Sequence, residues 1–132
     1  MTQLTFKIQK DTQIVLSYLT DIQKFVSVHP LIYKMTELDK NKYKVYESIK
    51  LGILTYRFTY QAVLTHEGSL VLIKASVMGL TKLTMNFHLR EEGNETVVVE
   101  ELTIKSVLPI KNFMTNLISK QHEEMFRNIF KA

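Results

Sequence analysis

The feature that most constrains the fold is a long stretch of alternating apolar and polar residues in the middle of the chain. In its clearest part, residues 54–65, polar residues alternate with the apolar set Leu54, Tyr56, Phe58, Tyr60, Ala62 and Leu64. A period of two places the apolar side chains of a strand on one face. Similar alternation, interrupted by turn signals such as Glu67-Gly68-Ser69, continues from Leu31 to Val107. The pattern predicts about six consecutive strands joined by short turns, which pair antiparallel.

Further elements flank this stretch. Residues 3–9 alternate in the same way and predict a first strand. Asp11 can cap a helical pattern that stops at His29-Pro30, and we expect a break at Thr20-Asp21, where Asp21 caps a second short helix. Residues 110–131 carry a broad apolar stripe and predict a helix of roughly 33 Å at about 1.5 Å per residue. The element order therefore predicts an α+β fold with helices on one face of an antiparallel sheet.

Composition limits the chemistry open to the chain. With 132 residues, 45% of them hydrophobic, we expect a single domain that spans residues 1–132. The absence of cysteine excludes a disulfide framework, a thiolate zinc site, an iron–sulfur cluster and a cysteine nucleophile. Four scattered glycines make no phosphate-cradling loop, and no histidine pair stands at i and i+4. We therefore expect no cofactor and no metal.

The charge pattern argues against nucleic acid as a partner. The net charge of +4 comes from 17 basic and 13 acidic residues, and only three of the basic residues are arginine. A dense basic stripe is missing, so we interpret the lysines as solvated strand faces. The N-terminus lacks a secretory pattern, and no apolar run approaches the roughly 20 residues of a membrane-spanning helix. The sequence predicts a cytoplasmic protein without stable membrane insertion.

The order of elements resembles that of the START-like, or Bet v 1-like, helix-grip superfamily (SRPBCC proteins, polyketide cyclases and lipid-transport proteins). The resemblance rests on a capped helix ending in Val28-His29-Pro30-Leu31-Ile32, strands between Tyr33 and Val107, and a helix after Pro109. It covers essentially the whole chain and implies a curved seven-stranded antiparallel sheet that grips a long C-terminal helix, with two short helices after the first strand.

In that superfamily the space between sheet and helix holds lipids, sterols, polyketides or other hydrophobic molecules. Some members are cyclases or dehydratases, and others carry lipids or quinones or regulate protein partners. The chain differs from the plant allergen branch, because Asp39-Lys40-Asn41-Lys42 stands where that branch has a glycine-rich loop. No residue set matches the known cyclase enzymes.

The dimensions of the predicted elements also indicate a cavity. A helix presents an apolar stripe about 10 Å wide, whereas six or seven strands spaced about 4.8 Å apart are nearly three times as wide. Part of the inner face must therefore meet the short helices, loops or a bound apolar molecule. The residues expected to bind such a ligand are Tyr43, Tyr56, Phe58, Tyr60, Met85, Phe87, Glu100, Phe113, Leu117 and His122. Ordinary core packing uses the same residue types, so each is also compatible with a purely structural role.

Three polar residues fall on faces that are otherwise apolar. Glu47 and Glu100 lie in strand alternations, and His122 lies near the apolar stripe of the last helix. They could orient a polar group or act as acid and base, or they could be satisfied by lysine, tyrosine or backbone. A bulge would turn Glu101 inward in place of Glu100. We assign His29 to a helix-end turn and expect neither it nor His66 and His88 to contact a ligand.

The favoured hypothesis is a non-catalytic domain that binds a hydrophobic small molecule, such as a lipid, a quinone or a polyketide-like compound. One alternative is a polyketide cyclase or dehydratase-like enzyme that uses Glu100, His122 and a tyrosine as its reactive groups. Another is a protein-interaction module with an exposed strand or helix. The sequence does not identify catalytic residues or a protein partner.

Overall fold

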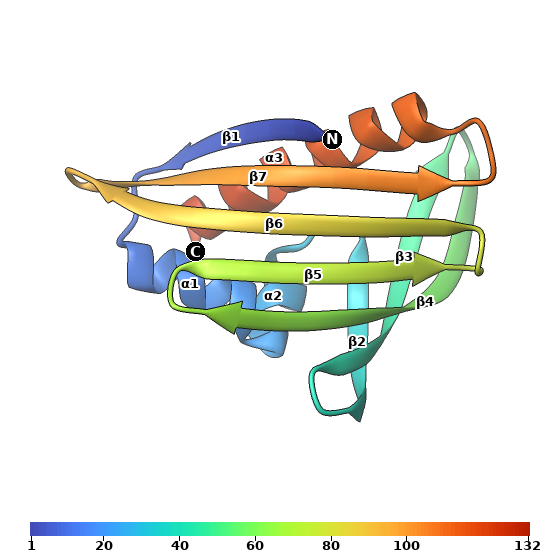
Figure 1. Cartoon of the computed structure of the whole chain (residues 1–132), viewed down its shortest axis with the longest axis horizontal. Helices are drawn as coiled ribbons and strands as arrows, with labels where there is room; N and C mark the ends of the chain where they lie inside the picture. Colours follow the sequence, from blue (N-terminus) through green and yellow to red (C-terminus); the bar gives the residue numbers. More distant parts are fainter.

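Seven strands form one antiparallel sheet in the order β1-β7-β6-β5-β4-β3-β2, with three helices on its concave side (Figure 1). The computed structural model describes residues 1–132. Its elements are β1 (Thr2–Ile8), α1 (Thr12–Thr20), α2 (Ile22–Val28), β2 (Ile32–Asp39), β3 (Lys42–Leu51), β4 (Leu54–Glu67), β5 (Leu70–Val77), β6 (Thr81–Glu92), β7 (Glu95–Ser106) and α3 (Lys111–Lys131). The predicted helix-grip architecture is confirmed, including the two short helices after the first strand.

Aspartate caps set the positions of the two short helices. The Asp11 carboxylate accepts a hydrogen bond from the Gln13 amide at 2.7 Å, and the Asp21 carboxylate accepts one from the Lys24 amide at 3.2 Å. Each carboxylate satisfies an amide that has no partner inside its helix. Asp21 is extended, so the chain bends between α1 and α2, and the predicted break at Thr20-Asp21 is confirmed.

The turn between β5 and β6 has an unusual residue at its tip. Met78 and Gly79 both have positive φ, 55° and 67°, and the Leu80 amide donates to the Val77 carbonyl at 3.1 Å. Two successive residues with positive φ match the twist of a tight hairpin, but a bulky side chain such as methionine is strained there. The turn nevertheless holds the Met78 side chain out in solvent.

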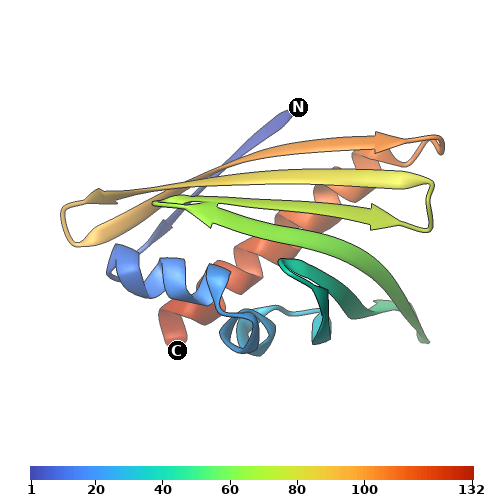
Figure 2. The same cartoon turned by 60° about the horizontal axis from the view of Figure 1, so that its bottom comes forward.

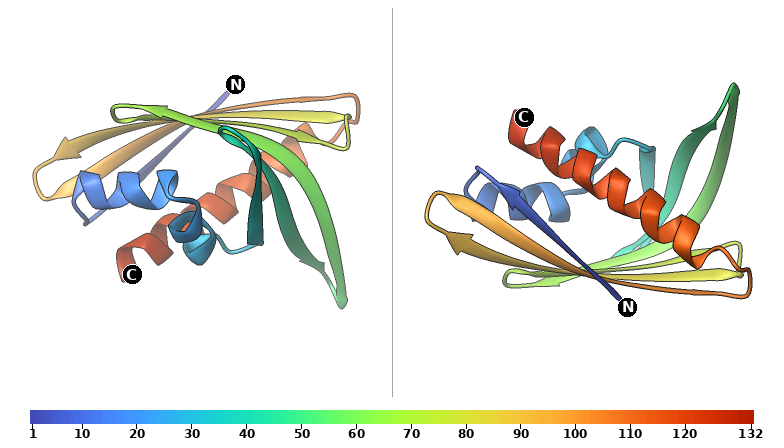
Figure 3. Two further views of the ribbon diagram at one scale, coloured as in Figure 1. Left: turned by 90° about the horizontal axis from the view of Figure 1, so that it is seen from below. Right: turned by 90° about the horizontal axis from the view of Figure 1, so that it is seen from above.

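The sheet bends so that its two halves face different directions. Strands β5, β6 and β7 form one gently twisted surface, and β2, β3 and the first half of β4 swing away from it (Figure 3). Helix α3 crosses the concave side obliquely and contacts β1 and β7, while α1 contacts β4, β6 and β7 near the opposite end of the strands (Figures 2 and 3). The helices therefore cover only part of the concave surface.

The core is densest where the C-terminal half of α3 meets the sheet. Met125 and Ile129 are fully buried, and the Phe126 ring lies 4.7 Å from that of Phe6 and 6.3 Å from that of Phe87. Offset aromatic pairs at such separations add stabilisation to the area they bury. None of the three helices combines the length and apolar character needed to span a membrane.

This core predicts that truncating two neighbouring residues of α3 changes the free energy of unfolding by very different amounts. Replacing the fully buried Ile129 with alanine leaves a cavity, and we expect a loss of about 3 kcal/mol in the free energy of unfolding. The matched variant Phe130→Ala removes a ring that is 48% exposed and should cost less than about 1 kcal/mol. Urea unfolding followed by circular dichroism measures both, and equal losses would contradict this view of the core.

Candidate ligand-binding cavity

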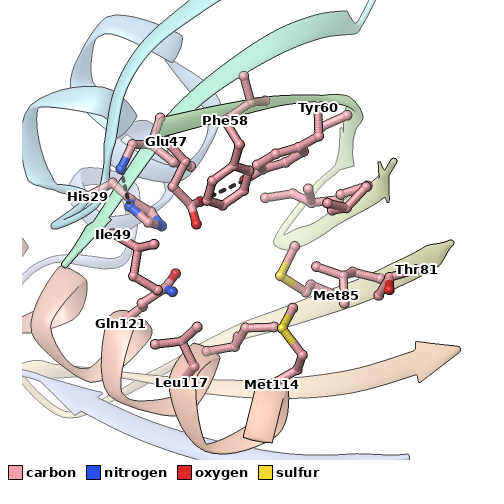
Figure 4. Close-up of a pocket in the computed structure, with 18 of the residues that line it drawn as sticks. His29, Glu47, Ile49, Phe58, Tyr60, Thr81, Met85, Met114, Leu117 and Gln121 are labelled. Atoms are coloured by element: carbon pink, nitrogen blue, oxygen red, sulfur yellow. Dashed lines mark hydrogen bonds between the residues drawn. The ribbon is translucent and has the colours of Figure 1, made fainter. Parts of the chain in front are cut away.

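A cavity of about 400 Å³ lies between the bent half of the sheet and the N-terminal half of α3 (Figure 4). Thirty residues line it, and 25 of them are hydrophobic. They come from strands β2 to β6, from α2 and α3, and from the loops beside them. The volume falls in the range of small-molecule sites, which are typically about 300 to 1,000 Å³.

Helix periodicity aligns one stripe of α3 with the cavity. The lining residues of this helix are spaced at i, i+1, i+4, i+5, i+8 and i+9, namely Phe113, Met114, Leu117, Ile118, Gln121 and His122. This spacing follows a single helical face. Strand β3 and the start of β4 bend away from α3 (Figure 3), and the cavity lies between these strands and this part of the helix.

Eight of the ten residues expected to bind a ligand line this cavity: Tyr56, Phe58, Tyr60, Met85, Phe87, Phe113, Leu117 and His122. Tyr43 and Glu100 do not line it. Tyr43 lies at the start of β3, whereas the cavity takes its β3 residues from Val45 onward. Glu100 faces inward from β7 but is fully covered, and its contact is with His122.

Glu47 and Tyr60 form a hydrogen-bonded pair in the cavity wall. The Tyr60 hydroxyl donates to Glu47 Oε1 at 3.0 Å across the β3–β4 pair (Figure 4). Burial raises the pKa of the Glu47 carboxyl above its usual 4.5, although the Tyr60 hydrogen bond and nearby His122 oppose the increase. Burial and the Glu47 charge likewise raise the pKa of Tyr60 well above 10. The pair places one carboxyl group inside an otherwise apolar hollow.

His29 has both a structural role and a place in the cavity wall. Its Nδ1 accepts hydrogen bonds from the Leu31 and Ile32 amides at 3.1 and 3.0 Å, which confirms the helix-end role. Burial, and then the charge of His122, lower the pKa of His29 from 6.5 to about 3, so the ring is neutral at pH 7. With Nδ1 accepting, the ring proton sits on Nε2. His29 also lines the cavity, a position that the sequence analysis did not expect.

Glu100 and His122 connect the sheet to α3. His122 Nδ1 lies 2.6 Å from Glu100 Oε1, and both side chains are buried. The β6–β7 register is continuous here and places Glu100 opposite Phe87, so no bulge turns Glu101 inward. Glu101 instead faces outward, with Oε1 2.7 Å from His88 Nε2. Glu100 is thus satisfied by a histidine, and not by lysine, tyrosine or backbone, while its Oε2 has no partner.

Gln121 is a cavity residue that sequence reasoning missed. Its side chain is buried, makes no hydrogen bond within the protein and points into the hollow beside Glu47 and His29 (Figure 4). The Gln121 amide atoms are not fully covered by the protein, so they stay accessible from the hollow. The signal available in the sequence was its position four residues after Leu117, which places it on the same helical face. We call the part of the cavity lined by Glu47, His29 and Gln121 its inner end. It gathers hydrogen-bond donors and acceptors from β3, from the end of α2 and from α3.

The shifted pKa of His29 predicts a pH-dependent stability. Below pH 6.5 the unfolded chain takes up a proton at His29 and the folded chain does not, so stability falls as the pH drops toward about 3. For one proton the slope approaches about 1.4 kcal/mol per pH unit. His29→Asn keeps an acceptor for the two amides but does not titrate. We expect the melting temperature of His29→Asn to rise relative to that of wild type as the pH falls.

Melting temperatures measured by circular dichroism between pH 7.5 and 4 test this expectation. Other groups of the chain also titrate there, so the quantity to follow is the difference between wild type and His29→Asn at each pH. The control is His66→Asn, which removes an exposed histidine near the end of β4. A constant difference for His29→Asn across the range would contradict the neutral, buried state of His29.

Comparison with known proteins assigns the chain to a family. The family model for CoxG, a carbon monoxide dehydrogenase subunit, matches residues 5–132. No curated protein matches the sequence. Among solved structures, a START superfamily protein from Mycobacterium smegmatis is 12% identical, with 98% of this chain and 94% of that one covered and a TM-score of 0.80.

Two further structures show the same fold. The di-domain ARO/CYC StfQ from the steffimycin biosynthetic pathway is 14% identical with a TM-score of 0.76; 98% of this chain and 49% of that one are covered. A STAR-related lipid transfer protein from Xanthomonas axonopodis is 10% identical with a TM-score of 0.61; 96% of this chain and 84% of that one are covered. These likenesses establish the START-like fold, and the match over residues 5–132 shows that the chain belongs to the CoxG family.

Proposed function

We propose that the chain binds one amphipathic small molecule, with its apolar body in the cavity and its polar group at the inner end. The observation that carries the proposal is the hollow of about 400 Å³, in which 25 of 30 lining residues are hydrophobic. The fold is shared with START superfamily, lipid transfer and ARO/CYC proteins, which supports a hydrophobic ligand.

Burial of the apolar body is the main source of affinity in this proposal. Each methylene group removed from water contributes about 0.8 kcal/mol. A chain of about ten carbons would gain roughly 8 kcal/mol, which has to exceed the loss of translational and rotational freedom on binding. Met85 and Met114 suit such a wall, because their flexible side chains adapt to ligands of irregular shape.

The inner end of the cavity determines which polar group is accepted. The Nε2–H of His29 and the Gln121 amide have no partner in the protein, and the second oxygen of Glu47 adds an acceptor. A ligand hydroxyl can donate one hydrogen bond to this set and accept up to two from it. Because burial disfavours charge at Glu47, we expect a neutral head group.

We further propose that binding occurs without catalysis. The cyclase-type alternative required Glu100 as an acid or base, and Glu100 is covered by the protein and does not line the cavity. Its hydrogen bond to His122 Nδ1 fixes the orientation of the His122 ring, which does line the cavity. In this arrangement Glu100 is a positioning residue for the polar end of the site.

A cavity-filling variant tests whether the hollow is the binding site. Ala62 faces the cavity, and its neighbour Val63 is exposed on the other face of β4. Ala62→Trp should occupy the space and weaken binding of the fluorescent probe N-phenyl-1-naphthylamine at least about tenfold, because roughly 1.4 kcal/mol of lost burial has that effect. Val63→Trp should leave probe affinity unchanged. Titration of the probe measures both, and equal affinities for the two variants would refute the cavity as the site.

The polar end is tested by comparing two ligands that differ in one hydrogen-bond donor. Dodecanol and its methyl ether carry similar apolar chains, but only the alcohol can donate a hydrogen bond. We expect wild type to prefer the alcohol by roughly twofold to tenfold, the effect of about 0.5 to 1.5 kcal/mol for one hydrogen bond. Gln121→Leu should reduce that preference while binding both compounds. Probe displacement measures the ratio, and a wild-type ratio of one would refute the assigned orientation but not apolar binding.

A further inference from the structure

The convex side of the sheet carries a group of basic side chains that the cavity does not use. All three helices lie on the concave side, so no helix covers the convex side (Figure 3). Strand alternation turns six basic residues toward it, and we call them the basic band: Lys34, Lys44, Arg57, Lys74, Lys82 and Lys105. The cavity wall contains no lysine or arginine. A molecule bound on the convex side would therefore contact different residues from a molecule in the cavity.

Strand pairing assembles the centre of the band. One row of paired residues crosses the strands from β3 to β7, and it consists of Lys44, Gln61, Ser76, Lys82 and Lys105. Neighbouring strands lie about 4.8 Å apart, so the four steps of the row span roughly 19 Å. Its members are far apart in the sequence, so no dense basic stripe appears along the chain. The stripe exists only across the strands.

The positive charges of the band are not neutralised within the protein. None of its six members takes part in an ion pair. Lys82 and Lys105 stand directly opposite each other, a like-charge pairing that destabilises a sheet. Glu101, the nearest acidic residue on β7, is bonded to His88 instead. The fold does not account for this arrangement, whereas an anionic partner would turn the repulsion into a favourable interaction.

A bulge in β2 adds an exposed tyrosine to the band. The β2–β3 register shifts between Ile32 and Lys34, and the extra residue is Tyr33, which is 50% exposed. Bulges of this kind re-aim a side chain. The Tyr33 ring lies 6.1 Å from the Tyr46 ring, and the Arg57 guanidinium lies 5.9 Å from the centre of the Tyr33 ring. Tyr33 therefore lies on the convex side, although Ile32 before it is buried.

The second tyrosine is also surrounded by cations. The ammonium groups of Lys34 and Lys44 lie 5.1 and 5.2 Å from the centre of the Tyr46 ring. Aromatic rings are platforms on which unpaired bases stack, and cations beside them bind the phosphates of the same strand. The β2 end of the band thus combines the two elements by which proteins hold single strands of nucleic acid.

We propose that the convex side binds a single strand of RNA or DNA across the sheet. The basic band contacts the phosphates, and Tyr33 and Tyr46 stack with bases. Polar side chains between the lysines, such as Gln61 and Ser76, supply further hydrogen bonds to the strand. An acidic protein fits less well, because the core of a protein interface is apolar and depleted of charge. A duplex fits less well, because its bases are already stacked inside the helix.

Fluorescence anisotropy with labelled oligonucleotides tests the charge component. A length of about 12 nucleotides lies within the roughly 4 to 16 nucleotides that single-strand-binding domains cover. Wild type should bind, and the logarithm of its affinity should fall with the logarithm of salt concentration by about 0.7 per phosphate contacted. Lys82→Ala with Lys105→Ala should weaken binding and reduce this slope by about 1.4. The control Lys120→Ala with Lys131→Ala removes the same charge from α3 and should bind like wild type.

A second set of variants tests base stacking. Tyr33→Leu removes the ring and should weaken binding at least about fivefold, the lower end of the effect of one stacked base. Tyr33→Phe keeps the ring and should bind like wild type. A duplex of the same sequence should bind wild type at least about fivefold more weakly than the single strand. RNA and DNA strands of one sequence both carry the proposed chemistry, and their relative affinity shows which of them is the better ligand.

Four results would overturn binding of a single strand: no binding of either oligonucleotide at about 0.1 M salt, equal loss in the control lysine variant, unchanged binding by Tyr33→Leu, or equal affinity for polyglutamate, which would indicate an acidic protein as the partner. Circular dichroism melting verifies that each variant is folded. Binding of N-phenyl-1-naphthylamine should be unchanged in all of these variants, because none of the altered residues lines the cavity. Failure of the probe to bind wild type would refute the ligand proposal and leave nucleic-acid binding intact.

Discussion

The structure depends on a mismatch between a wide, bent sheet and a single long helix. Helix α3 packs tightly against β1 and β7 through its C-terminal half, where Met125 and Ile129 are fully buried. Toward its N-terminus the strands β3 and β4 turn away, and the cavity lies between them and the helix. Close packing is the normal state of a protein interior, so a hollow of about 400 Å³ forgoes many favourable contacts. Dense packing around the C-terminal half of α3 supplies the stability that permits a hollow beside its N-terminal half.

The buried polar groups also differ between the two halves of α3. Where α3 meets the sheet, Glu100 and His122 form a hydrogen bond between two covered side chains, and removing either partner would leave the other buried and unpaired. Where α3 leaves the sheet, Gln121 and His29 retain free donors that point into the hollow. Glu100 and His122 pair with each other between sheet and helix, and Glu100 Oε2 alone is left without a partner there. Gln121 and His29 instead present donors to a molecule that occupies the hollow.

Much of the fold was predictable, because strand alternation and aspartate caps are local signals. The alternation around Tyr56 and Phe58 indicated which side chains face inward, and these residues line the cavity. What the pattern does not contain is the bend of β3 and β4 or the oblique path of α3, which decide how far along each strand the hollow extends. Tyr43 and Glu100 share the inward face but lie outside that extent. Gln121 is polar, so its helical spacing from Leu117 was the one sign in the sequence that it faces inward.

The clustering of basic residues at the ends of β3, β6 and β7 is equally hard to recognise from the sequence. Lys50, Lys82 and Lys105 are far apart along the chain and alternate with other residues, as solvated lysines do. Only the antiparallel pairing brings Lys82 beside Lys105 and collects three turns at one end. The loops at residues 78–80 and 107–110 also contribute Leu80 and Leu108 to the cavity wall. The side chains of these loops therefore belong both to the surface and to the wall of the cavity.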